Sequence, residues 1–197
     1  MVTTLTVQQN LQLLGKYRYV EMEMMELIGS WAYTMIQPEI KIAFGRHLYQ
    51  DAVHADLIGK RIPELKGRSK QYQSIAPSDE FVKLVEKIWK ADDELRRMIG
   101  LYRILKPAMI DAMKQHLKHA ELPADEPTAY ILRHIADEEL DHAAWGGTMI
   151  EKLTVTPSDR ERGKTWYEEL SKELKESGGL WGEGKSPGKY SFRKTHP

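Results

Sequence analysis

Cysteine is absent from all 197 residues of the chain. Its absence excludes disulfide bonds, thiolate metal sites and cysteine nucleophiles, so any bound metal would have oxygen and nitrogen ligands. Long apolar runs are absent too, and the first residues form neither a basic nor an apolar segment, so we expect no membrane span. The 29 Lys and Arg residues balance 29 Asp and Glu residues, which leaves no bulk charge to recruit nucleic acid. The sequence therefore predicts a soluble cytoplasmic protein.

Apolar residues recur with a helical period along the chain, and we find no segment with the alternation of a strand. We predict helices over residues 7–36, 39–58, 78–120 and 128–153, with a long crossover over residues 59–77. Gly100 and Pro107 must bend or interrupt the third segment, and one bent helix or two helices both fit there. Short, long and short connections are typical of two helical hairpins joined by one crossover.

The predicted fold class is therefore all-α, a four-helix bundle of two hairpins with one long crossover. We expect the bundle to occupy residues 1–156 as one domain. Residues 157–197 then form a C-terminal helix, which ends near residue 177, and a tail. We expect this segment to pack on the bundle or on a partner subunit.

Two short motifs place a carboxylate three residues before a histidine: Asp51 with His54, and Glu139 with His142. On a helix, both members of such a pair point from one face towards one spot. Glu21 interrupts the apolar stripe of the first predicted helix, about 16 residues before the turn that follows it, and His54 lies about 16 residues after that turn. These groups therefore meet at one depth. Because an unpaired buried carboxylate is costly, we expect a cation there, either a metal ion or a basic side chain.

The motifs resemble those of the ferritin-like superfamily of dimetal-carboxylate four-helix bundles. The resemblance covers about residues 11–153 and depends on Glu21, Asp51-x-x-His54 and Glu139-x-x-His142 in that order. In that superfamily the first and third helices each supply a glutamate, and the second and fourth each supply a Glu-x-x-His. The resemblance implies that these five residues are metal ligands. It also implies iron, as one or two ions, or manganese as the metal, with O2 as cosubstrate.

The third predicted helix departs from the family pattern, because the level that faces the motifs holds Lys106 and no carboxylate. A lysine there would change the charge of the site by about two units, so a second metal ion should bind weakly or only with substrate. His47, one helical turn before the first motif, is a further candidate ligand, and Glu138 could substitute or bridge. A surface lysine beside the bend at Pro107 would explain Lys106 equally well.

We therefore predict a non-haem iron- or manganese-dependent oxidase or oxygenase that acts on a small organic molecule, with a homodimer as a candidate assembly. Lys106 and Tyr102 are the candidate catalytic residues, and Tyr102 could line the pocket. One alternative is a non-catalytic or storage-type ferritin-like protein. Another is a metal-free bundle in which Lys106 pairs with buried carboxylates in a structural or acid/base network. The tail, residues 180–197, is the one basic and aromatic stretch, but we do not expect it to bind RNA.

Overall fold

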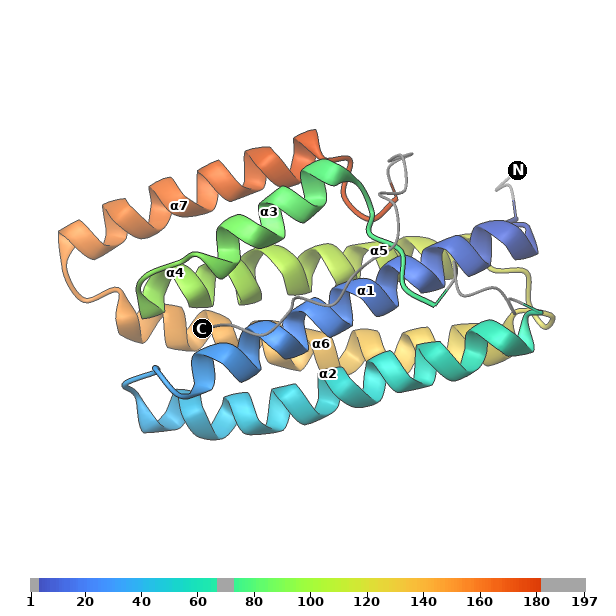
Figure 1. Ribbon diagram of the computed structural model, residues 1–197, viewed down its shortest axis with the longest axis horizontal. Helices are drawn as coiled ribbons and strands as arrows, with labels where there is room; N and C mark the ends of the chain where they lie inside the picture. The colour runs from blue at the N-terminus through green and yellow to red at the C-terminus, as the bar shows by residue number, and fades with distance from the viewer. Residues whose placement is uncertain (1–3, 67–72, 182–197) are drawn as a thin grey trace.

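The computed structural model describes residues 4–66 and 73–181, and within these ranges the chain is helical and contains no strand (Figure 1). The elements in chain order are α1 (Val7–Ala32), α2 (Pro38–Glu64), α3 (Asp79–Trp89), α4 (Glu94–Ile99), the π-helix η2 (Gly100–Leu105), α5 (Lys106–His119), α6 (Glu126–Leu153) and α7 (Pro157–Glu176). The predicted all-α class is confirmed. Over the same ranges, no helix combines the length and the apolar character that a membrane crossing requires.

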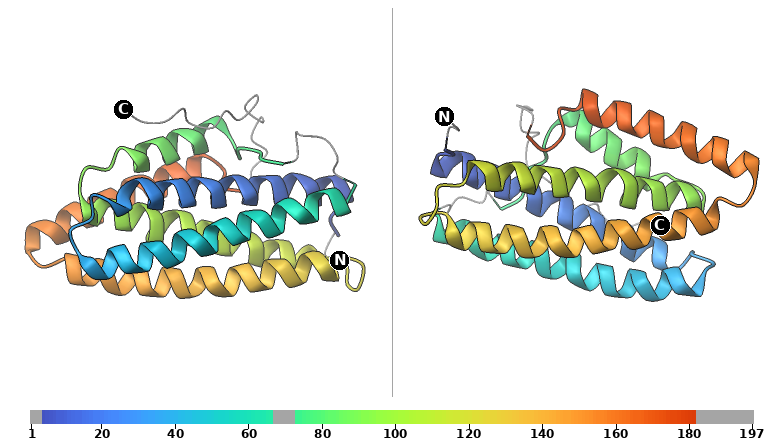
Figure 2. Two further views of the ribbon diagram at one scale, coloured as in Figure 1. Left: turned by 60° about the horizontal axis from the view of Figure 1, so that its bottom comes forward. Right: turned by 180° about the vertical axis from the view of Figure 1, so that it is seen from behind.

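Two antiparallel hairpins form the body of the molecule (Figure 2). The first consists of α1 and α2, and the second consists of α5 and α6. A capping box at Thr6 and Gln9 starts α1, and Pro38 occupies the first turn of α2, where its missing N–H group is harmless. Large apolar side chains from all four helices fill the space between them, among them Tyr17, Ile28, Phe44, Met109 and Leu132. The polar cluster described below is embedded in this core.

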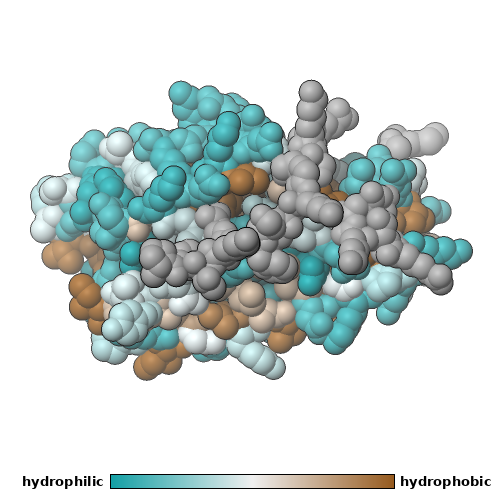
Figure 3. Space-filling model, viewed as in Figure 1, coloured by the Kyte–Doolittle hydropathy of each residue, from teal (hydrophilic) through white to brown (hydrophobic). Residues whose placement is uncertain are grey.

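Helices α3 and α7 lie side by side on the outside of the hairpins (Figure 1). Lys87 of α3 donates hydrogen bonds to Glu169 and Glu173 of α7. The indole N–H of Trp166 donates to the carbonyl of Arg96 at 3.0 Å. Hydrophilic side chains gather on the solvent side of this layer (Figure 3). The C-terminal helix therefore packs on the bundle of its own chain.

Two helix boundaries differ from the prediction. The first helix ends at Ala32 rather than near residue 36, and the second continues past Gly59 to Glu64. Gly59 lies inside the helix, beside the side chain of Arg18 of α1. A Cβ atom at this position would lie 2.8 Å from Nε of Arg18, which donates a hydrogen bond to the carbonyl of Ala55. The helix continues through the glycine, so the crossover is shorter than predicted. The predicted tail lies outside the described residues from residue 182 onwards.

The predicted segment 78–120 is interrupted twice. The chain leaves the helix after Trp89, and Asp93 caps α4 by accepting a hydrogen bond from the backbone of Arg96. This first interruption was not predicted. The second lies between Gly100 and Pro107, as predicted, and is the π-helix η2, in which the N–H of Lys106 bonds to the carbonyl of Leu101, five residues back. Pro107 has no N–H group to offer an α-helix, so the wider turn before it is a natural accommodation.

His116 lies buried on α5, against the start of α1. Its protonation should make the stability of the protein depend on pH. Its Nε2 atom is 2.6 Å from Oδ1 of Asn10. Burial lowers the pKa of His116 to about 4, so the folded protein keeps the ring neutral at pH 7. The unfolded chain takes up this proton near pH 6.5. The free energy of unfolding should therefore fall by about 3 kcal/mol through this one group as the pH drops from 7 to 4.

The variant His116→Gln isolates this effect, because its amide can still donate to Asn10 but does not titrate. Urea unfolding at a series of pH values should show a smaller loss of stability on acidification in the variant than in the wild type. An equal loss in the two proteins would contradict the assignment of a neutral buried ring.

Candidate metal centre

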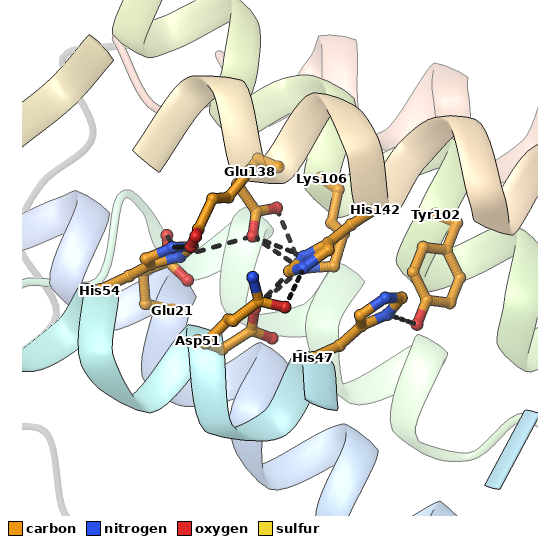
Figure 4. Close-up of polar contacts among 10 residues, drawn as sticks. Glu21, His47, Asp51, His54, Tyr102, Lys106, Glu138 and His142 are labelled. Carbon is orange, nitrogen blue, oxygen red and sulfur yellow. Dashed lines mark hydrogen bonds and ion pairs between the residues drawn. The ribbon is translucent and has the colours of Figure 1, made fainter. Parts of the chain in front are cut away.

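Four fully buried side chains meet in the middle of the bundle (Figure 4). Glu21 comes from α1, Asp51 and His54 come from α2, and Glu139 comes from α6. One donor atom from each lies within 4.8 Å of the donor atoms of the other three. The structure thus brings together four of the residues that the sequence singled out. It does so because the hairpin turn sets α1 and α2 at matching depths.

His54 is held so that one ring nitrogen faces the carboxylates. Its Nε2 atom lies 2.7 Å from Oε2 of Glu138, so Nε2 carries the proton and donates it to this carboxylate. Its Nδ1 atom lies 3.4 Å from Oε1 of Glu21 and 3.6 Å from Oε1 of Glu139. A neutral ring would turn its lone pair towards two carboxylate oxygens. A proton, on Nδ1 or on one of these carboxylates, or a metal ion must therefore lie between these atoms.

His142 is oriented in the same way from α6. Its Nε2 atom is 2.9 Å from the side-chain oxygen of Gln50. Its Nδ1 atom is 3.3 Å from Oε1 of Glu139 and 3.8 Å from Oδ1 of Asp51. Gln50 and Glu138 thus fix the two rings from outside the cluster. Sequence reasoning missed Gln50, and its position next to the first motif was the only signal for it.

Lys106 is fully buried, and its ammonium group lies between two of the carboxylates. Nζ donates to Oδ1 of Asp51 at 3.0 Å and to the two oxygens of Glu139 at 2.8 and 3.0 Å. Burial alone would lower the pKa of Lys106, but Asp51 and Glu139 hold it above its ordinary value. Burial would likewise raise the pKa of Glu139, and the lysine charge holds it well below. The alternative of a surface lysine is therefore wrong.

When its carboxyl groups are ionised, the cluster contains more negative charge than its own side chains neutralise. Both oxygens of Glu21 and Oδ2 of Asp51 are buried without a hydrogen-bond partner in the part of the chain that the structure describes. Burial raises the pKa of Glu21, and the charge of Glu139 raises it further. Burial also raises the pKa of Asp51 well above its ordinary value, so in the metal-free protein protons on Asp51 and Glu21 relieve the charge. With all three carboxyl groups ionised, Lys106 alone would leave two negative charges. Burial alone would lower the pKa of His54, but Glu21 and the hydrogen bonds to its neighbours raise it to about 11. A proton there still leaves one negative charge, so the residues fit a bound divalent cation.

His47 and Tyr102 lie beside the cluster rather than in it. Nδ1 of His47 and the hydroxyl of Tyr102 share a hydrogen bond of 2.7 Å. The His47 ring stacks on His142, with 3.9 Å between the ring centroids. Burial and the nearby charges of His142 and Lys106 lower the pKa of His47 to about 2, so the ring is neutral. The structure thus places His47, predicted as a further ligand, in an aromatic wall next to the site.

Comparison of the chain with protein-family models and with curated proteins finds no match. The interpretation of the cluster therefore depends on its own donor atoms, charges and burial.

Proposed function

We propose that the chain is a ferritin-like, non-haem iron- or manganese-dependent oxidoreductase that acts on a small organic molecule. The observation that carries the proposal is the set of unpaired, fully buried oxygens on Glu21 and Asp51, which lie next to the inward-facing Nδ1 of His54. Unpaired buried acceptors of this kind are costly unless a cation binds them. A set of carboxylate and imidazole donors suits iron or manganese. Such an ion, when bound with open positions, supplies the capacity to activate O2 and oxidise an organic molecule.

The side chains around the proposed ion have different roles. We expect Glu21, Asp51, His54 and Glu139 to hold the metal, since their donor atoms share one centre. Glu138, whose side chain is 31% exposed, orients His54 by accepting a hydrogen bond from Nε2. Glu138 thus connects the buried site to solvent at the seam between α2 and α6. We infer that the substrate approaches along this seam.

The arrangement of the hairpins supports the ferritin-like part of the proposal. The carboxylates and histidines come from α1, α2 and α6, in the order that the resemblance implies, and they converge inside two antiparallel hairpins. The helix that contains α5 supplies a lysine in place of the fourth carboxylate. The predicted homodimer and the small-molecule substrate remain parts of the same proposal.

Metal content after expression in iron- and manganese-supplemented medium tests this proposal. We expect the purified wild-type protein to contain at least about one equivalent of metal, and Glu21→Gln to contain less than about a tenth. The metal-free variant should be at least as stable as the metal-free wild type, because the amide removes an uncompensated buried charge. The iron-loaded wild type, supplied with a reductant, should also consume O2 faster than the variant.

The matched control is Glu23→Gln. Glu23 lies on the same helix and is also buried, but its carboxylate accepts a hydrogen bond from the indole of Trp89 of α3. This variant should keep the metal content of the wild type. Equal metal loss in both variants, or a wild type that binds neither iron nor manganese, would reject the proposal.

A second candidate function is acid/base chemistry without a metal. The direct contact of Lys106 with Asp51 and Glu139 favours it. With a proton on Nδ1 of His54, the lysine and the imidazolium would hold the carboxylates without a metal. Such a network could perform acid/base chemistry. It predicts that chelator-treated protein keeps both its full activity and its full thermal stability, whereas the metal proposal predicts that both fall.

A further inference from the structure

Lys106 stands where the ferritin-like pattern has a carboxylate, and its Nζ atom is itself one of the cations of the cluster. The ammonium lies against Oδ1 of Asp51 and both oxygens of Glu139. Nδ1 of His142 faces the same Oδ1 of Asp51 at 3.8 Å and Oε1 of Glu139 at 3.3 Å. The ammonium of Lys106 thus already provides a positive charge where Asp51, Glu139 and His142 would otherwise bind a metal ion.

The remaining donors define one centre. Donor atoms of Glu21, Asp51, His54 and Glu139 lie within 4.8 Å of one another, and these four are the one group of that kind in residues 4–66 and 73–181. Three of the four unpaired atoms of the cluster belong to Glu21 and His54, which are not hydrogen-bond partners of Lys106, and the fourth is Oδ2 of Asp51. The open coordinating capacity therefore lies mainly on residues that the ammonium does not contact.

The balance of charge in the cluster also favours a single metal ion. Glu21, Asp51 and Glu139 bring three negative charges into a fully buried space. One divalent ion and the ammonium of Lys106 bring three positive charges, so the cluster becomes neutral. Two divalent ions and the ammonium would bring five positive charges and leave two uncompensated in the core. Uncompensated buried charge is strongly unfavourable.

We propose that Lys106 takes the place of the second cation of a dimetal site, so that the centre holds a single divalent ion. This inference rests on the proposed function, since it concerns the metal that Glu21 and His54 would bind. Lys106 then sets the charge of the site through its contacts with Asp51 and Glu139. A carboxylate at this position should convert the centre into one that takes two ions.

Metal stoichiometry tests the inference, with Mn²⁺ as the probe. Metal-free protein is loaded with Mn²⁺, dialysed and analysed for bound metal, and its electron paramagnetic resonance spectrum is recorded. We expect one equivalent and the spectrum of an isolated ion in the wild type. We expect two equivalents and the spectrum of a coupled pair in Lys106→Glu. Lys114→Glu makes the same change on the exposed side of the same helix and should bind one equivalent.

A second variant covers the case in which Lys106→Glu fails to fold. Lys106→Met removes the charge but keeps a side chain of similar length. It should still bind one Mn²⁺, with an affinity about tenfold or more above that of the wild type, because a neighbouring positive charge is gone. Unchanged or weaker binding in this variant would overturn the inference.

The outcomes separate the inference from the proposed function. A wild type that binds two equivalents overturns the inference and leaves the metal function standing. A folded Lys106→Glu that binds only one also overturns it. A wild type that binds no Mn²⁺ and no iron rejects the proposed function and the inference together.

Discussion

Replacing Gly146 with alanine should lower the free energy of unfolding by about 3 kcal/mol. Gly146 lies buried in α6, where Tyr102 of η2 packs directly on its backbone. A Cβ atom at this position would overlap Cβ and Cγ of the tyrosine, and backbone-proximal atoms cannot swing away as the end of a flexible side chain can. Either α6 or η2 must shift. The hydrogen bond between Tyr102 and His47 should therefore be disturbed as well.

Gly45→Ala is the matched control for this prediction. Gly45 lies in the interior of α2, and a Cβ atom there would meet no other atom within 4 Å. Alanine is the better helix former, so this variant should be about 0.5–1 kcal/mol more stable than the wild type. Urea unfolding of the two variants gives both values. A Gly146→Ala variant as stable as the wild type would show that the contact of Gly146 with Tyr102 is not as tight as described.

Lys106→Met should destabilise the metal-free protein by about 3–5 kcal/mol, because it leaves Asp51 and Glu139 buried without their shared cation. The loss of three hydrogen bonds to the ammonium acts in the same direction. Chemical unfolding in the presence of a chelator measures this effect. Lys114→Met, at an exposed position of α5, should change stability by no more than about 0.5 kcal/mol.

The double variant Lys106→Met/Glu139→Gln distinguishes a charge effect from a packing effect. Glutamine removes one of the two carboxylates that the lysine neutralises, so the double variant should regain at least about half of the lost stability. If the loss came from packing, the second substitution would add to it. A double variant less stable than Lys106→Met would thus contradict the charge argument.

The location of the site could be predicted from the sequence because helical periodicity fixes directions and depths. The spacing of Asp51 and His54, and of Glu139 and His142, placed each pair on one helix face. Counting residues from the hairpin turn placed Glu21 at the same level, and the structure has Glu21, Asp51, His54 and Glu139 together, with His142 beside them. The same counting reached Lys106, but periodicity alone did not show whether its long side chain turned inwards or towards solvent.

The features that sequence reasoning missed depend on contacts between distant elements. Gly59 is locally typical of a helix end, and the packing of the Arg18 side chain against this part of α2 is not visible in the local sequence. The interruption after Trp89 follows from the cap that Asp93 forms, one of several acidic residues in that stretch. Gln50 became a site residue because α6 places His142 opposite it. In each case the partner lies far away in the sequence or competes with equivalent neighbours.

Anomalous X-ray scattering from crystals of the protein loaded with iron or manganese tests the central claim most directly. The account predicts one anomalous peak within bonding distance of Glu21, Asp51, His54 and Glu139, with Nζ of Lys106 still in contact with Asp51. Anomalous maps without a peak among these residues, in crystals soaked with either metal, would contradict it. The buried carboxylates would then be balanced by protons and by the lysine alone.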